Sequence, residues 1–175
     1  MSKQSRTGSR AAVACVCLMA VAGASAQERR SGPPSNLHGG AYQQLIEQMW
    51  RDSPTFRDQC DRLAGEPQLR VVIRGESRPT TTGARADSAI STLKNGKVSR
   101  ADVVLRSPAD SIELIAHEIE HVIERMEGVR LRDQGCTGTS GRPDAYESCR
   151  AVDIGRRVAR EVEESKAAPS RIARR

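Results

Sequence analysis

The amino-acid sequence predicts an α+β fold, in which a small antiparallel sheet packs on a central helix and further helices lie on its N- and C-terminal sides. Three patterns predict it. Residues 111–127 gather apolar side chains on one face of a helix and His and Glu on the other. Residues 97–105 form a β-rich run directly before that helix, and Asn95-Gly96 offers a two-residue turn from a partner strand at 88–94.

The other elements follow from local signals along the chain. Residues 41–51 repeat apolar side chains at helical spacing, which predicts a first helix. Ser53-Pro54 is typical of an N-cap followed by a first-turn proline, and it predicts a second helix that runs to about Leu63. The run of β-branched residues within 69–74 predicts a strand.

The central helix and the final helix also have start and stop signals. Ser107-Pro108-Ala109-Asp110 predicts the entry of the central helix, and Gly128 predicts its end. Residues 144–166 predict the final helix, with Asp144 as its N-cap. Its core-facing side chains share one stripe at helical spacing: Ala151, Ile154, Val158 and Val162.

Residues 1–26 have the pattern of a secretory signal peptide. Three basic residues and no acid precede the apolar run 11–22, and Ala24-Ser25-Ala26 fits a cleavage site. That run is too short to span a membrane, so we expect export to the periplasm or beyond and a mature chain without a transmembrane segment. Loss of the three basic residues would lower the formal net charge from +6 to +3.

The remaining chain divides into a flexible lead-in at 27–40, one domain at 41–166 and a basic tail at 167–175. His38, in the lead-in, is expected to be an ordinary exposed side chain. With one Phe, two Tyr and one Trp, the chain offers few aromatic side chains for stacking on bases. Nucleic acid is therefore not an expected partner.

Three cysteines remain after the signal, Cys60, Cys136 and Cys149. An odd number in an oxidising compartment predicts one disulfide and one thiol. Cys136 could pair with Cys149, or Cys60 could pair with either of them, and the sequence leaves the pairing open. A cysteine-based zinc site is disfavoured because no pair has the short spacing that such sites use.

The stretch from His117 to His121 carries the most specific chemical signal, His-Glu-x-x-His. Positions i and i+4 lie one turn apart on one face of a helix, so both imidazoles can reach one metal ion. On a helical wheel Glu118 lies about 100° from His117, beside this pair. Glu120 lies near 300°, where we expect a charge at a solvated rim. The alternative interpretation is a solvated polar face that happens to contain two His.

With this motif after a strand, the region 98–128 resembles the zincin superfamily of zinc metallopeptidases. The resemblance implies a zincin-like fold, one Zn²⁺ per chain bound by His117 and His121, and a peptide or protein substrate. It also implies that Glu118 is the general base toward the water that the zinc activates. Strand 97–105 would then be placed to pair with an extended substrate.

A catalytic zinc needs a third protein ligand. A metzincin-like continuation fails, because Glu124 and Glu127 stand where Gly and the third His would be. A gluzincin-like arrangement takes a Glu from a later helix, and Glu147, near the start of the final helix, is the favoured ligand. Glu124 is expected to hold an imidazole by a hydrogen bond, or to be the alternative ligand. Asp153 would face elsewhere.

Stabilisation of an oxyanion would need a further donor, for which Tyr146 and Arg150 are the nearest candidates in sequence. The function expected from these residues is zinc-dependent peptide hydrolysis. The competing class is a non-catalytic zinc-binding or interaction protein, since a short mature chain leaves little material to wall a substrate groove. A carboxylate-bridged di-iron site would need Glu-x-x-His on two helices and finds it only at Glu118–His121.

Overall fold

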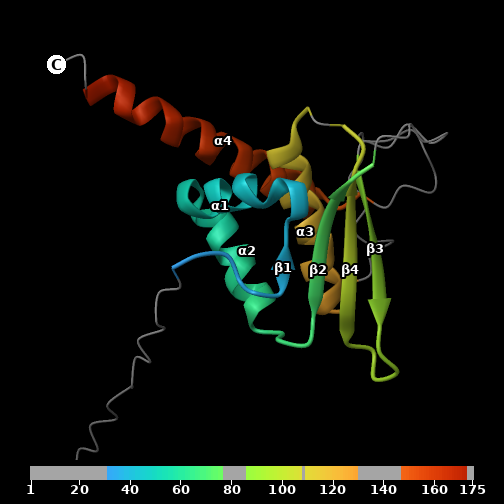
Figure 1. Ribbon diagram of the computed structural model, residues 1–175. Helices are drawn as coiled ribbons and strands as arrows, with labels where there is room; N and C mark the ends of the chain where they lie inside the picture. Colours follow the sequence, from blue (N-terminus) through green and yellow to red (C-terminus); the bar gives the residue numbers. More distant parts are fainter. Residues whose placement is uncertain (1–30, 77–85, 108, 130–146, 173–175) are drawn as a thin grey trace, which may run out of the picture.

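The computed structural model describes residues 31–76, 86–107, 109–129 and 147–172 (Figure 1). The predicted signal peptide, Cys136, Asp144 and Tyr146 lie outside these residues. The described elements follow one another as β1 (Leu37–His38), the 3-10 helix η1 (Gly40–Tyr42), α1 (Gln43–Asp52), α2 (Pro54–Ala64), β2 (Arg70–Gly75), β3 (Ala86–Thr92), β4 (Val98–Leu105), α3 (Ser111–Met126) and α4 (Cys149–Ile172).

The sheet is mixed, with the strand order β1-β2-β4-β3. β1, β2 and β4 run parallel, and only β3 is antiparallel to its neighbour β4. The prediction of an antiparallel sheet is therefore wrong, although the α+β class is confirmed. The sequence contains a turn signal only for the local hairpin. The parallel pairing of β2 with β4, in which Arg70 lies opposite Arg100, joins segments far apart in the sequence and needs no tight turn.

The hairpin between β3 and β4 has a longer connection than predicted. Leu93 N–H donates to Lys97 O at 2.7 Å, which leaves three residues, 94–96, in the loop. Gly96 adopts a φ of +82°, the left-handed conformation that such loops place after a type I turn. Asn95 therefore precedes this glycine in a wider turn than the expected two-residue one.

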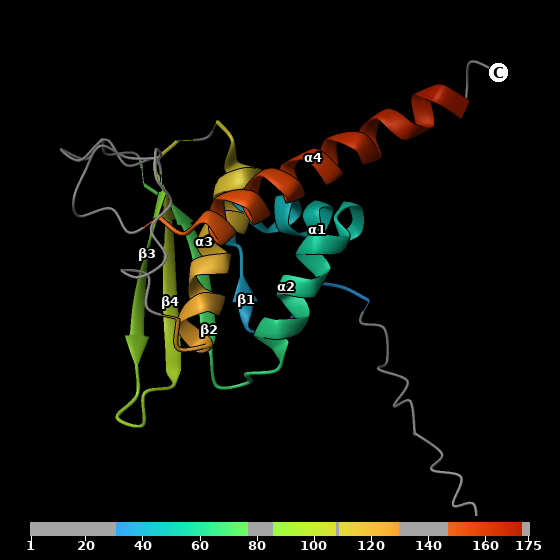
Figure 2. The same cartoon turned by 180° about the vertical axis from the view of Figure 1, so that it is seen from behind.

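One face of the sheet is covered by α3, and α2 and α4 pack against α3 in turn (Figures 1 and 2). The core lies between the sheet and these helices because alternate residues of β2 and β4 point inward. Its largest fully buried apolar side chains are Phe56, Ile46, Met49, Leu63, Leu69, Ile73, Leu105, Ile115, Ile119 and Ile123.

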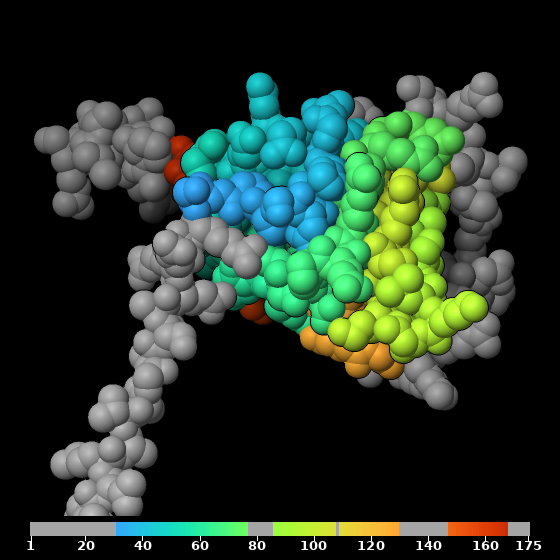
Figure 3. Space-filling model, turned by 60° about the horizontal axis from the view of Figure 1, so that its bottom comes forward, coloured from blue at the N-terminus to red at the C-terminus, as the bar shows by residue number. Residues whose placement is uncertain are grey.

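Part of the predicted lead-in belongs to the fold. Leu37 is 4 % exposed and pairs with Val71 at the start of the sheet. The side-chain amide of Asn36 donates to the backbone carbonyls of Leu63 and Glu66, which anchors the segment on the end of α2. Figure 3 shows this N-terminal segment, in blue, lying beside green residues of α2 and β2. A two-residue strand has no periodicity, so composition alone suggested flexibility. His38 is exposed, as predicted.

The helix signals are confirmed at most ends. Ser53 caps α2 by accepting a hydrogen bond from Phe56 N–H, and α3 ends at Met126, two residues before the left-handed Gly128 (φ +75°). α4 begins at Cys149 and not at Asp144, because Ser148 supplies the cap. It continues to Ile172, so the predicted tail is helical over 167–172.

The cysteines differ in state. Cys149 is disulfide-bonded, whereas Cys60 is a buried thiol within the core, so the pairings that placed Cys60 in a disulfide are wrong. Within the described residues no helix combines the length and the apolar character that crossing a membrane requires.

Candidate metal centre

The motif helix α3 is buried on most of its circumference. Ile115 and Ile119 enter the core, while α4 packs against α3 next to His117. His121 and Glu118 are each only 6 % exposed. The interpretation of this stretch as a solvated polar face is therefore wrong.

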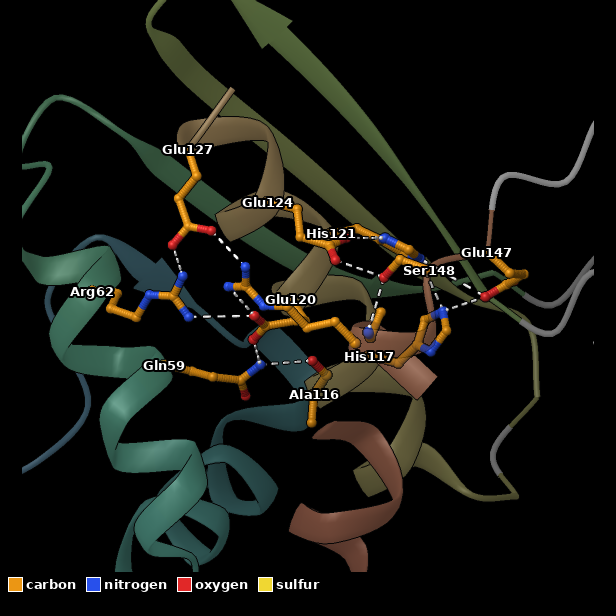
Figure 4. Close-up of polar contacts among 12 residues, drawn as sticks. Gln59, Arg62, Ala116, His117, Glu120, His121, Glu124, Glu127, Glu147 and Ser148 are labelled. Atoms are coloured by element: carbon orange, nitrogen blue, oxygen red, sulfur yellow. Dashed lines mark hydrogen bonds and ion pairs between the residues drawn. The ribbon is translucent and has the colours of Figure 1, made fainter. Parts of the chain in front are cut away.

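The two motif imidazoles converge with one carboxylate from outside the helix (Figure 4). Nε2 of His117 lies 3.1 Å from Nε2 of His121. Oε2 of Glu147 lies 2.9 Å from the first nitrogen and 3.9 Å from the second. Ligand atoms bound at about 2.0 Å to a tetrahedral ion are about 3.3 Å apart, so these separations fit a shared cation. His117, His121 and Glu147 could thus hold a metal ion.

Glu147 reaches the two His from the residue just before the cap of α4. The sequence placed it inside the first turn of that helix, and the structure places it one residue ahead of Ser148. Its Oε2 atom is buried and makes ion pairs with His117 and His121, but it has no hydrogen bond of regular geometry among the described residues. A buried carboxylate oxygen without a hydrogen bond is costly, and a cation between the three side chains would satisfy it.

Glu124 orients the second imidazole. Its Oε2 lies 3.0 Å from Nδ1 of His121, the contact expected for a carboxylate that holds a ligand histidine. With a proton on Nδ1 donated to Glu124, Nε2 of the neutral ring keeps its lone pair for a metal. The other oxygen of Glu124 accepts a 2.6 Å hydrogen bond from the hydroxyl of Ser148. Ser148 is not among the site residues predicted from the sequence, although Ser is a frequent residue at a helix N-cap.

Glu118 lies beside the imidazoles but is not one of the three converging ligands. It is buried under β3, where the side chain of Ser88 hydrogen-bonds to it. Burial raises the pKa of Glu118 above its usual value, and the nearby His117 and His121 oppose that shift. Glu118 is therefore a buried carboxylate close enough to the two histidines to be affected by their charges.

Glu120 does not lie at a solvated rim, so that expectation is wrong. It is 1 % exposed and accepts a hydrogen bond from Gln59 of α2 at 2.8 Å. Arg62 of α2 and Arg150 of α4 pair with the same carboxylate, with N–O distances of 3.3 and 2.5 Å. The charge is tolerated because two cations and an amide surround it. The helical wheel could not show this, since the partners come from other helices.

Arg150 forms ion pairs with Glu120 and Glu127. Figure 4 shows these two carboxylates on the opposite side of the cluster from Glu147. A guanidinium that pairs with both carboxylates is a link between α3 and α4. Its role as an oxyanion donor stays a prediction from the sequence. Tyr146, the other candidate, lies outside the described residues.

The expectation that strand 97–105 pairs with a substrate is wrong, because β2 and β3 occupy both edges of β4.

Close contact between α3 and α4 next to His117 depends on a glycine. A Cβ added to Gly155 would lie 2.8 Å from the backbone oxygen of Glu113 and 3.2 Å from Cβ of His117. No larger residue fits this crossing without moving one helix. Gly155 thus lets the helix that follows Glu147 approach the helix that carries the two His.

The charges at the site predict how metal binding depends on pH. The pKa of Glu147 is held well below its usual range, first by the contact with His117 and then by His121. Burial alone would lower the pKa of His121, but Glu147, Glu118 and Glu124 outweigh it and raise the pKa above 6.5. Glu147 is therefore ionised across the neutral range, while His121 retains a proton to higher pH than an ordinary histidine.

A proton and a metal ion compete for His121, so we expect the apparent Zn²⁺ affinity to fall as the pH is lowered. Above the raised pKa the ring is neutral and the affinity is constant. Below it, the affinity falls by up to about tenfold per pH unit for each proton displaced. Titration against a competing chelator between about pH 5.5 and 8.5 measures this, and a flat profile would contradict it.

Comparison with other proteins adds no identification: no family model, no curated protein and no solved structure matches this chain.

Proposed function

We propose that the protein is an exported zinc-dependent hydrolase that cleaves peptide bonds. The observation that carries the proposal is the convergence of His117, His121 and Glu147 at ligand-to-ligand distances, with the buried carboxylate of Glu118 beside them. Export is inferred from the pattern of residues 1–26.

The donor set supports zinc. Two imidazole nitrogens and one carboxylate oxygen are the protein ligands of one class of catalytic zinc site, and three ligands leave a fourth position open. A site built only of carboxylates would favour Mg²⁺ or Ca²⁺, and one with thiolates would favour a structural zinc. The hydrogen bond from His121 to Glu124 is the kind of outer contact that fixes a ligand imidazole.

When bound, zinc would lower the pKa of a coordinated water to about 7 and polarise the scissile carbonyl. Glu118 would accept the proton of the attacking water and deliver it to the departing amine. The raised pKa of Glu118 suits both steps, because a carboxylate with a higher pKa takes up the proton of water more readily and keeps it until the amine departs. Glu147, kept ionised, would contribute the negative charge of the ligand set.

β3 is the strand with which an extended peptide substrate could pair near the metal centre. Among the described strands β3 is paired on one side only, with β4, and its Ser88 contacts Glu118. We therefore place the substrate along the edge of β3 that no described strand occupies, where addition of a strand would bring its carbonyls past the metal. This replaces β4 as the substrate strand.

Metal analysis tests the proposal. The purified protein should retain one Zn²⁺ per chain, and Glu147→Gln should lower the Zn²⁺ affinity by about 100-fold or more because a charged ligand is lost. Glu164→Gln removes an exposed carboxylate of α4 and is the matched control, with unchanged affinity expected.

Three outcomes separate the alternatives. A protein that binds no divalent transition metal at neutral pH would refute both zinc hypotheses. Equal affinity in Glu147→Gln and the wild type would remove Glu147 from the ligand set. Zinc binding without hydrolysis of any member of a broad peptide library would instead support the non-catalytic zinc-binding function.

A further inference from the structure

We propose that Ser148 is a positioning residue that fixes the carboxylate of Glu147 and the imidazole of His121 together, so that one hydroxyl sets the geometry of the metal centre. This inference rests on the proposed zinc site. It assigns a role to a residue outside the ligand set.

The hydroxyl of Ser148 connects two structural elements. It accepts a hydrogen bond from the backbone N–H of Ala151 at 2.9 Å, which caps α4. It donates to Oε1 of Glu124 on α3 at 2.6 Å. The other oxygen of Glu124 contacts Nδ1 of His121 at 3.0 Å, so an unbroken chain of contacts runs from the start of α4 to an imidazole (Figure 4).

Ser148 is the neighbour of a proposed metal ligand in the sequence. Ser148 directly follows Glu147, so the hydrogen bond that holds Ser148 against α3 also fixes the backbone from which the Glu147 carboxylate reaches His117. Ser148, Glu124 and His121 are 0 %, 1 % and 6 % exposed. Water has little access to replace a lost hydroxyl, and both ends of the ligand set would loosen at once.

A capping serine on its own would explain only stability, and the chain contains a matched case. Ser53 caps α2, is likewise 0 % exposed, and accepts from Phe56 N–H at 2.9 Å. Its hydroxyl also donates to a carboxylate on another helix, that of Glu161 at 2.5 Å. The two serines thus make equivalent contacts, but only Ser148 is linked to the metal ligands.

The experiment compares Ser148→Ala with Ser53→Ala in the purified protein. Loss of a helix cap should lower the stability of both variants by a similar amount. Ser148→Ala alone should lower the Zn²⁺ affinity, by about 10- to 100-fold, the usual effect of removing an outer contact to a ligand. In the Co²⁺-loaded protein, Ser148→Ala should also change the visible absorption of the ion, and Ser53→Ala should leave that absorption unchanged.

Circular dichroism of each variant establishes that it is folded before metal is added. Zn²⁺ affinity of Ser148→Ala within about threefold of the wild type would overturn the inference, and so would an equal loss in Ser53→Ala. Failure of the wild type to bind Zn²⁺ or Co²⁺ would refute the proposed metal centre itself. A wild type that binds zinc but hydrolyses no peptide would refute the enzymatic function and leave the role of Ser148 standing.

Discussion

Replacing Glu118 with Gln is expected to reduce peptide hydrolysis by about 10²- to 10⁴-fold, the usual contribution of a general base. The amide has the same size and can keep the hydrogen bond with Ser88, but it cannot accept the proton of an attacking water. Because Glu118 is not among the three converging ligands, Zn²⁺ affinity should stay near that of the wild type. Cleavage of quenched fluorescent peptides and metal analysis of the same sample measure the two effects.

Glu113→Gln is the control for a loss of negative charge on the same helix, since Glu113 lies in the first turn of α3 and is half-buried. It should hydrolyse peptides at the wild-type rate. Retained activity in Glu118→Gln would show that another group takes the proton. Loss of zinc from Glu118→Gln would show that the carboxylate belongs to the ligand set.

Gly155→Val is expected to lower the free energy of unfolding by about 3 kcal/mol and to weaken zinc binding as well. The new side chain would have to occupy space already taken by the backbone oxygen of Glu113 and by Cβ of His117. Relief of that overlap moves α4 away from α3, and Glu147 moves with α4. Chemical denaturation without metal and a Zn²⁺ titration measure the two losses separately.

Ala167→Val controls for the intrinsic effect of valine, because Ala167 is an exposed residue of the same helix. This substitution should cost about 0.5 kcal/mol, the difference in helix propensity between Ala and Val. Gly155→Ala should fall between the two, since the gain in helix propensity offsets part of the overlap. Stability of Gly155→Val equal to that of Ala167→Val would mean that the helix crossing does not depend on the glycine.

Local features of this fold could be predicted from the sequence, because their causes are local. Ser53 and Gly128 mark the helix ends where the chain indeed turns, and the stripe of Ala151, Val158 and Val162 is buried. The parallel pairing of β2 with β4 escaped prediction because the two strands are far apart in sequence. The order of strands depends on which apolar faces meet, and no local pattern records that.

The candidate site shows the same division. The one-turn spacing of His117 and His121 follows from helix geometry, so their convergence could be predicted from the motif. Glu147 could be proposed only from the need for a third ligand. The buried ion pairs of Glu120 and the hydroxyl of Ser148 depend on contacts between helices. Sequence periodicity describes one helix at a time, so it assigned Glu120 to solvent.

The distribution of the ligands along the chain also bears on how the molecule assembles. His117 and His121 lie one turn apart, whereas Glu147 lies 26 positions after His121 in the sequence. Closing a loop of that length costs about 3 kcal/mol of chain entropy. A divalent ion bound by all three ligands would hold this loop closed. The C-terminal helix α4 should therefore detach first when a chelator is added. Protease cleavage would then begin at that end of the protein.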